Sequence, residues 1–203
     1  TDYNRLTYAT VQKVLKPETE KEIQRIVKKA VKEKAKISIM GNRCNIGGHS
    51  FSNGSWLLDM SKFNKVLSLD KKRKQITVQS GILWEDIQEY INPHKLSMLT
   101  MQSSNQFTVG GSLGANIHGR DIQNSTIIKS VKSFKIVIGD GSVKYVSRKN
   151  NYELFRLAIG GYGLFGVITE VTLQLVDNEV YEQRAVMIKM NEIPDFFKDK
   201  ILR

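Results

Sequence analysis

The pattern of apolar and polar positions predicts a chain that mixes strands and helices. After Pro17, the residues Ile23, Val27 and Val31 recur at helical spacing, which predicts a helix with one apolar face. Over 167–175 apolar and polar residues alternate, which is typical of a half-buried strand, and we expect it to close a sheet. By the same criteria we expect further strands over 8–15, 37–40, 56–59, 66–70, 75–79, 134–138 and 143–147, and further helices over 84–91 and 152–159.

The order of these elements favours the α+β class. Strands and helices follow one another without a regular βαβ period, and no internal repeat is visible. The strands over 56–59, 66–70 and 75–79 are expected to form a meander. From Tyr181 onward, a new strand and a short helix around 193–200 are typical of the start of another domain.

Composition limits the environment of the protein. With 203 residues, 40% of them hydrophobic, the chain can bury a substantial core. No apolar run approaches the roughly 18 residues that a membrane-spanning helix needs. Cys44 is the single cysteine, which excludes an intrachain disulfide and favours a reducing cytoplasm. The first residue is Thr1, so a targeting segment upstream is compatible with the sequence.

The net charge of +11 raises the question of a nucleic-acid partner. The distribution of charge argues against one, because the basic cluster over 21–36 is interleaved with Glu18, Glu20, Glu22 and Glu33, as on a solvated helix face. We therefore expect a solvated basic surface and no nucleic-acid partner.

Three glycine-rich loops carry the candidate chemistry: 41–50, 110–119 and 160–166. Glycine at this density lets backbone N–H groups converge on an anion, and the first two loops are suited to a pyrophosphate. The sequence lacks both the dinucleotide motif G-x-G-x-x-G in its strand-to-helix setting and the phosphate-loop motif G-x-x-x-x-G-K-[ST]. Taken alone, each loop is more often a tight turn than a ligand cradle.

The order of these loops resembles a known family. In succession the chain carries GNRCNIGGHS at 41–50, LLDM at 57–60, VQSG at 78–81, TVGGSLGANIHG at 108–119 and GGYGLFGVI at 160–168. This succession, over residues 8–175, resembles the FAD-binding domain of the vanillyl-alcohol oxidase and p-cresol methylhydroxylase (PCMH-type) superfamily. Within it, the chain looks nearest to the decaprenylphosphoryl-ribose oxidase and the alditol or lactone oxidase types.

The resemblance implies a two-lobed fold and a division of the chain. A small βαβ-type N-terminal lobe would pack on a larger mixed or antiparallel sheet with flanking helices. The FAD-binding domain would span 7–177, with lobes at about 7–65 and 66–177. Residues 178–203 would begin a truncated substrate or cap domain.

The same resemblance implies the site. The first loop would bind the FAD pyrophosphate through its backbone, 108–111 would pack along the phosphates and ribityl chain, and 115–119 would pass near the flavin. Val167 and Ile168 would reach the adenine by backbone contacts. The complete set of implied cofactor-binding residues is Gly41, Asn42, Arg43, Cys44, Asn45, Ile46, Gly47, Gly48, His49, Ser50, Ser103, Thr108, Val109, Gly110, Gly111, Ser112, Ala115, Asn116, His118, Gly119, Gly163, Val167 and Ile168.

One departure from the family bears on how FAD is held. Many members attach the flavin through a histidine of the first loop, and here Cys44 stands at that position while His49 follows the paired glycines. Non-covalent FAD is the favoured reading, a His49 link comes second and a Cys44 thioether third. The plainer roles are a small, partly buried thiol for Cys44 and a loop histidine bonded to backbone or phosphate for His49.

The implied activity is hydride transfer from a CH–OH carbon to flavin N5, followed by reoxidation by oxygen or another acceptor. His118 is the candidate catalytic residue, and a histidine that merely orients its loop is an equal alternative. The substrate would be a small alcohol, sugar or lactone, and its pocket would come largely from the domain that follows. The histidines and the cysteine form no metal motif.

Two other functions stay open at this point. One is a non-catalytic module that binds flavin or a polyanion. The other is a reductase that uses FAD with NADPH, for which a second dinucleotide motif would be expected and is not visible.

Overall fold

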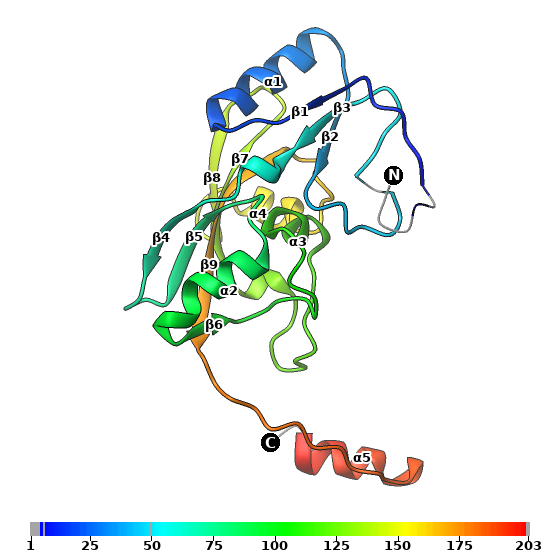
Figure 1. Ribbon diagram of the computed structural model, residues 1–203, viewed down its shortest axis with the longest axis vertical. Coiled ribbons are helices and arrows are strands. Elements are labelled where there is room, and N and C mark those ends of the chain that lie inside the picture. The colour runs from blue at the N-terminus through cyan, green and yellow to red at the C-terminus, as the bar shows by residue number, and fades with distance from the viewer. Residues whose placement is uncertain (1–4, 6, 49, 202–203) are drawn as a thin grey trace.

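The computed structural model describes residues 5, 7–48 and 50–201. Its strands are β1 (Lys13–Leu15), β2 (Ile37–Met40), β3 (Trp56–Asp59), β4 (Val66–Asp70), β5 (Gln75–Gln79), β6 (Leu96–Met98), β7 (Val131–Val137), β8 (Val143–Ser147) and β9 (Val167–Asp177). Its α-helices are α1 (Glu20–Lys32), α2 (Trp84–Ile91), α3 (Val109–Ala115), α4 (Tyr152–Ala158) and α5 (Ile193–Phe196). Figure 1 shows a small sheet near the N-terminal end of the chain and a larger sheet below it.

The small sheet is parallel, with the order β1-β3-β2. Helix α1 connects β1 to β2, so these elements form a βαβ unit. The side chain of Thr19 caps α1 by accepting a hydrogen bond from the Glu22 N–H, and Ile23, Val27 and Ala30 form its buried stripe. Ile23 and Val27 belong to a cluster with residues of β3, β7 and β9, so α1 helps to hold the two sheets together.

The larger sheet is antiparallel along the path β4-β5-β9-β7-β8. Strand β9 lies at its centre, between β5 and β7, and its C-terminal end also pairs with β6. The burial pattern of β9 alternates along its length, with Val171, Leu173 and Leu175 in the main core and Val167 in the cluster that includes α1. This strand therefore joins two hairpins into one sheet.

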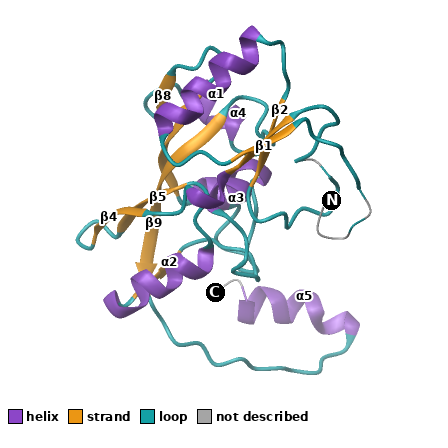
Figure 2. Cartoon of the chain, turned by 45° about the horizontal axis from the view of Figure 1, so that its top comes forward, coloured by secondary structure: helices purple, strands orange, loops and turns teal. Residues whose placement is uncertain are grey.

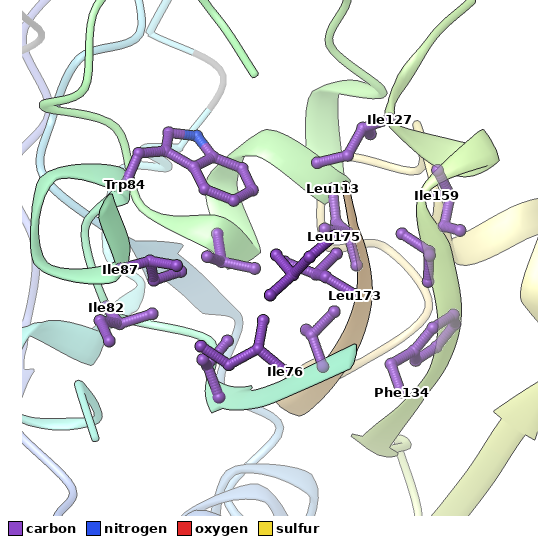
Figure 3. Close-up of a cluster of buried hydrophobic side chains, with 14 of the residues drawn as sticks. Ile76, Ile82, Trp84, Ile87, Leu113, Ile127, Phe134, Ile159, Leu173 and Leu175 are labelled. Atoms are coloured by element: carbon purple, nitrogen blue, oxygen red, sulfur yellow. The ribbon is translucent and has the colours of Figure 1, made fainter. Parts of the chain in front are cut away.

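The main core lies between this sheet and helices α2, α3 and α4. In Figure 3 the side chains of Trp84 and Ile87, Leu113, and Leu173 and Leu175 converge from α2, α3 and β9. Burying one such side chain stabilises the fold by about 1.5–3 kcal/mol relative to leaving it exposed. The core thus includes Val109 and Leu113 of α3, which hold this helix against the larger sheet.

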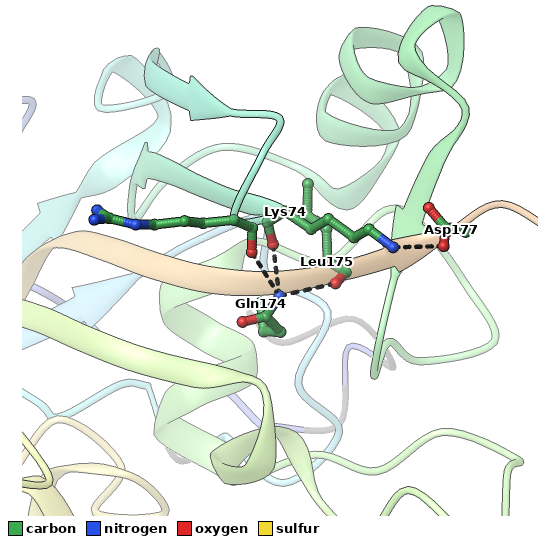
Figure 4. Close-up of polar contacts among 5 residues, drawn as sticks. Lys74, Gln174, Leu175 and Asp177 are labelled. Atoms are coloured by element: carbon green, nitrogen blue, oxygen red, sulfur yellow. Dashed lines mark hydrogen bonds and ion pairs between the residues drawn. The ribbon is translucent and has the colours of Figure 1, made fainter.

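A polar contact closes the turn between β4 and β5 against β9. The Nε2 of Gln174 donates to the carbonyl oxygens of Lys74, at 2.8 Å, and Arg73, at 3.1 Å, while Lys74 also forms an ion pair with Asp177 (Figure 4). Lys74 adopts a left-handed backbone with φ of 51°, which the turn requires. The exposed ion pair itself adds little stability.

Most predicted elements are confirmed, and several boundaries are corrected. The strand expected over 8–15 is limited to β1, and the helix expected from Pro17 begins only at Glu20 because Thr19 supplies the cap. The strand expected over 134–138 extends back to Val131, and the strand expected over 167–175 extends to Asp177. Strand β6 was not expected, because three residues carry too little periodicity.

One prediction of sheet organisation is wrong. The expected meander does not form, because β3 pairs in parallel with β1 and β2 whereas β4 and β5 pair with each other. The last strand completes its sheet as expected, and it does so from the centre, between β5 and β7. Periodicity reveals which residues face the core but not which strand is the neighbour.

The segment 178–201 extends away from both sheets. No strand follows Tyr181 in the part of the chain that the structure describes, contrary to expectation, whereas the expected helix is present as α5 with short turns on either side. None of its described residues is buried, and Figures 1 and 2 both show α5 apart from the rest of the chain. In the described residues, no helix combines the length and apolar character needed to cross a membrane.

Candidate cofactor site

The first glycine loop contacts the residues that lead into the second loop and its helix α3. The Nδ2 of Asn42 donates to the carbonyl of Gln106 at 2.8 Å, just ahead of α3. A Cβ on Gly41 would lie 2.2 Å from Oγ1 of Thr108, the N-cap of α3. Glycine at position 41 therefore lets the backbone of the first loop lie directly against the side chain of Thr108.

The third glycine loop packs on the other end of α3. The N–H groups of Gly160 and Tyr162 donate to the carbonyls of Leu113 and Gly114 at 2.9 and 3.0 Å. A Cβ on Gly163 would lie 3.1 Å from Cδ1 of Ile39 in β2. All three loops thus meet at α3, where the small and large sheets adjoin.

Among the described residues, each of the three loops contains one non-glycine residue with a left-handed backbone. These residues are Arg43, Asn116 and Tyr162, with φ of 57°, 47° and 49°. Asparagine tolerates this region, whereas arginine and tyrosine adopt it at a cost of about 1–3 kcal/mol. The same backbone occurs outside these loops at Lys34, Lys74, Lys95 and Asn151, so it marks tight turns and does not by itself identify a ligand site.

The first loop presents backbone donors that the described protein does not use. Within the described residues, the N–H groups of Asn42, Arg43, Cys44, Ile46 and Gly47 donate no hydrogen bond. Successive free N–H groups around a left-handed residue form a concave anion site. This part of the chain can accordingly hold a phosphate without any cationic side chain.

The first N–H groups of α3 are, in contrast, already engaged. The N–H groups of Val109 and Gly110 donate to the carbonyls of Ile82 and Ser80 at 3.0 and 2.6 Å, and that of Gly111 donates to Oγ1 of Thr108 at 3.3 Å. Residues 108–111 can therefore contact a ligand by packing rather than by donating to it. The exposed side of α3 at Gly111 and Ala115 is free of bulky side chains.

The structure brings most of the predicted cofactor residues to these loops, with different degrees of exposure. Ser103, Gly119 and Asn116 lie beside the end of α3, while Val167 and Ile168 begin β9 directly after the third loop. His49 lies outside the described residues. Among the predicted cofactor residues that the structure describes, the exposed ones are Asn42, Arg43, Ile46, Gly47, Ser103, Gly111, Ala115, His118 and Gly163. The partly buried ones are Gly41, Cys44, Asn45, Ser50, Gly110, Asn116, Gly119 and Ile168. The buried ones are Gly48, Thr108, Val109, Ser112 and Val167.

The thiol of Cys44 is held as a hydrogen-bond donor. Its Sγ lies 3.3 Å from the carbonyl oxygen of Asn42 and 3.6 Å from that of Gln106. Burial raises the pKa of Cys44 above its ordinary value. Because the thiolate is the reactive form, this environment lowers the reactivity of the sulfur.

The imidazole of His118 is exposed and its tautomer follows from its contact. Nδ1 lies 2.9 Å from the carbonyl oxygen of Gly119, which can only accept, so we assign the proton to Nδ1. In the neutral ring Nε2 is then an acceptor, and no described residue donates a hydrogen bond to it. This arrangement suits a group that takes up a proton.

A buried polar triangle behind α3 was not predicted from the sequence. Nε1 of Trp84 donates to Oε1 of Gln102 at 2.8 Å and to Oγ of Ser112 at 3.0 Å, and Oγ of Ser112 donates to the same Oε1 at 2.9 Å. Gln102 belongs to no glycine motif, so loop patterns could not identify it. A buried tryptophan needs a partner for its N–H, which was the available signal.

Two further observations test whether the residues fit a dinucleotide cofactor. Oδ1 of Asn116 and Oγ1 of Thr100 are buried without a hydrogen-bond partner in the described structure, at positions flanking α3 and Gln102. Buried polar atoms normally find a partner. Together with the free N–H groups of the first loop, they fit a long ligand that carries phosphates and polar ring atoms, as FAD does.

Other possible sites lie elsewhere or are absent from the described residues. A hollow beside Leu15 and Ile26 is lined by no residue of the glycine loops. A second, beside Tyr152 and Arg156, is lined by residues of α4, just ahead of the third loop, and by none of the loop residues themselves. Within the residues described, no three histidine, cysteine or acidic side chains gather as a metal site would require. The glycine loops therefore remain the candidate site.

Comparisons with known proteins agree with this geometry. The profile of a family described as FAD binding domain matches residues 11–147. L-gulonolactone oxidase of Mus musculus is 31% identical over 76% of this chain and 35% of its own length, and decaprenylphosphoryl-beta-D-ribose oxidase of Mycolicibacterium smegmatis is 26% identical over 85% and 38%. The L-galactono-1,4-lactone dehydrogenase of Brassica oleracea, a mitochondrial protein, is 29% identical over 87% of this chain and 29% of its own.

A solved structure shares the fold. Alkyldihydroxyacetonephosphate synthase superposes with a TM-score of 0.73 at 24% identity, covering 81% of this chain and 31% of that one. This likeness confirms the expected α+β fold with a parallel and an antiparallel sheet. The chain spans about a third of the length of the curated relatives it matches.

Proposed function

Because the chain belongs to the family of FAD binding domains, whose cofactor is FAD, we propose that it provides the cofactor site of an FAD-dependent oxidoreductase acting on CH–OH groups. Relatives named as oxidases and dehydrogenases of gulonolactone, galactonolactone and decaprenylphosphoryl-ribose support a sugar or lactone as the substrate class. Since the chain spans about a third of these relatives, the activity is proposed for the whole protein.

The free N–H groups of the first glycine loop carry this proposal. They face no partner in the described residues, and the contacts of Asn42 and Gly41 hold the loop against α3. A loop that holds its backbone donors ready for phosphate binds it without reorganisation, which favours affinity. A tight turn alone would use these donors internally.

The chemistry divides between cofactor and protein. When bound, FAD would accept the hydride, a reaction that amino-acid side chains cannot perform. The first loop would hold the phosphates, the exposed face of α3 at Gly111 and Ala115 would pack along the cofactor, and Nε2 of His118 would accept a proton. A His118→Gln variant tests the last role: an unchanged rate of flavin reduction across pH in the whole protein would exclude it.

We propose further that FAD is bound without a covalent link. Cys44 occupies the position at which many members carry a linking histidine, and its protonated thiol donates to two backbone carbonyls. Such a thiol is a poor nucleophile. His49 remains the alternative point of attachment.

The segment 178–203 is proposed to belong to a substrate domain that follows residues 7–177. Val180, Tyr181 and Met187 are exposed by 101%, 83% and 100%, which is unusual for apolar side chains outside an interface.

The proposed location of the protein is the cytoplasm, because the chain contains a single cysteine. Fractionation of cells that make the whole protein tests the location.

The absorbance spectrum of the purified chain, before and after acid precipitation, tests the cofactor proposals. We expect flavin bands that pass into the supernatant on precipitation. Colour retained in the pellet would show a covalent link and contradict the non-covalent proposal. A chain that neither retains FAD nor takes it up when it is added would overturn the assignment of the site.

A further inference from the structure

We propose that Gln102 is a further cofactor-binding residue, whose side-chain amide nitrogen donates a hydrogen bond to bound FAD. The inference rests on FAD binding at the glycine loops. It concerns a residue in the segment between β6 and α3, outside all three loops.

Hydrogen bonds from two buried residues, Trp84 and Ser112, fix the orientation of the Gln102 side-chain amide. Its Oε1 accepts from Nε1 of Trp84 and from Oγ of Ser112, which are 0% and 1% exposed as residues. Both of these groups act as donors, so the oxygen of the amide must be the atom that faces them. Figure 3 shows the indole nitrogen of Trp84 on the side of the ring away from Ile76 and Leu173, where it is available to this contact.

The amide nitrogen of Gln102 consequently points away from the buried triangle. Within the described residues, Nε2 has no hydrogen-bond acceptor. Gln102 is only partly buried, so the nitrogen can meet a ligand. A side chain whose one end is held by two buried donors loses little conformational entropy when its other end binds.

The location of Gln102 matches the exposed face of α3. Ser112 lies at the border between the buried stripe of Val109 and Leu113 and the exposed positions Gly111 and Ala115. Gln102 contacts α3 at this border. Its chain neighbours Met101 and Ser103 lie against 119–120, because a Cβ on Gly119 would be 2.9 Å from the carbonyl of Met101 and Nε of Arg120 donates to Oγ of Ser103 at 3.0 Å.

The chemistry of the free group suits the cofactor. FAD offers phosphate oxygens, ring carbonyls and ring nitrogens as acceptors, and an amide N–H₂ supplies two donors. Oγ1 of Thr100, two residues earlier, is also buried and has no hydrogen-bond partner among the described residues, and Thr100 as a whole is only 4% exposed. The segment 100–103 thus holds polar groups that the described protein leaves unused.

The structural and ligand-binding roles of Gln102 reside on different atoms, so one substitution separates them. Gln102→Glu keeps an oxygen for the donors Trp84 and Ser112 but replaces the N–H₂ with a second oxygen. We expect the dissociation constant of FAD, measured by titration of the apo chain, to rise about tenfold or more. The melting temperature of the apo chain should stay unchanged. Gln88→Glu, the same substitution on the exposed side of α2, should alter neither quantity.

A second variant covers the case in which the carboxylate disturbs the fold. Gln102→Met removes the amide without adding charge, and Trp84 keeps its bond to Ser112 at 3.0 Å. We expect FAD to bind several-fold more weakly to this folded variant. Wild-type affinity in Gln102→Met, or in a folded Gln102→Glu, would overturn the inference while leaving the FAD site intact. A wild-type chain that takes up no FAD would overturn the site as a whole.

Discussion

Gly41, Gly111 and Gly139 illustrate how differently the same residue can act in one chain. A side chain at Gly41 would strike Thr108, whereas a Cβ on Gly111 meets only Oγ1 of Thr108 at 3.0 Å, and one on Gly139 meets no atom within 4 Å. Glycine at 41 therefore permits the contact between two loops, and glycine at 111 leaves the outer face of α3 open. Substitutions at these sites should separate folding from cofactor binding.

Gly111→Trp should fold and fail to bind FAD. The indole would project from the exposed side of α3 and fill the space along which the cofactor packs. Loss of FAD uptake in a titration, with unchanged far-UV circular dichroism, is the expected result. Gly139→Trp, in the exposed turn after β7, is the matched control and should bind FAD normally. Normal binding by Gly111→Trp would count against the site.

Cys44 should react slowly with thiol reagents at neutral pH. Because burial raises its pKa, the thiolate is scarcer than that of a free cysteine, and the rate of alkylation by iodoacetamide should increase only at higher pH than for free cysteine. The dependence of this rate on pH, with N-acetylcysteine as reference, provides the measurement. A profile shifted to lower pH would indicate an activated thiol and revive the thioether alternative.

The glycine loops were predictable from the sequence, whereas Gln102 and the free N–H groups were not. Runs of glycine and asparagine can be recognised directly in the sequence, and the order of the three loops resembles that of a known family. Which backbone donors remain free depends on contacts such as those of Val109 and Gly110 with Ile82 and Ser80, which are remote in sequence. The importance of Gln102 depends in the same way on the packing of Trp84.

At the scale of elements, local signals determined most helices and strands but not their partners. Thr19 and the apolar stripe of α1 are local, and the helix was predicted with an error of a few residues at its start. The parallel pairing of β3 with β1 and β2 depends on α1 and on the loops that connect these strands. The residue pattern within β3 therefore could not reveal which strands are its partners. Three-residue strands such as β6 are defined by their partner alone.

Asp59, at the end of β3, should make stability depend on pH. Burial opposes its ionisation, but hydrogen bonds from Ser61 and the nearby charge of Lys16, at 3.4 Å, outweigh burial and lower its pKa. A lowered folded-state pKa stabilises the fold above the ordinary pKa of aspartate, and this contribution is lost as the pH falls through the lowered value.

The variant Asp59→Asn measures this contribution. We expect it to lower the free energy of unfolding by about 1–2 kcal/mol at pH 7. The difference from wild type should shrink toward pH 3, as judged by urea denaturation at both pH values. Asp70→Asn, at an exposed position in β4, serves as the control. An equal difference at both pH values would show that the charge of Asp59 is not involved.

At the scale of the whole molecule, residues 178–201 contribute few contacts to the rest. The backbone N–H of Asn178 donates to the carbonyl of Lys95 at 2.9 Å, and no described residue beyond it is buried. The two sheets and their helices, in contrast, share two apolar clusters. The cofactor site should therefore form independently of the segment that follows.

A chain that ends at Asn178 should retain the fold and the affinity for FAD. We expect its melting temperature to differ by less than about 4 °C, equivalent to roughly 1 kcal/mol. It should also elute as a more homogeneous species in size-exclusion chromatography, because exposed residues such as Met187 and Met190 are removed. A large loss of stability would show that the segment packs on the sheets.

The central place of β9 also has a consequence for how the chain is made. Its partners β5 and β7 are synthesised first, and until Asp177 has left the ribosome the hairpins β4–β5 and β7–β8 lack the strand that unites them. Unpaired strand edges are prone to improper association. The small sheet can form early, from residues 13–59, while the larger one must wait. Expression at lower temperature, or with chaperones that shield nascent strands, should therefore raise the yield of folded protein more than any change in the finished surface.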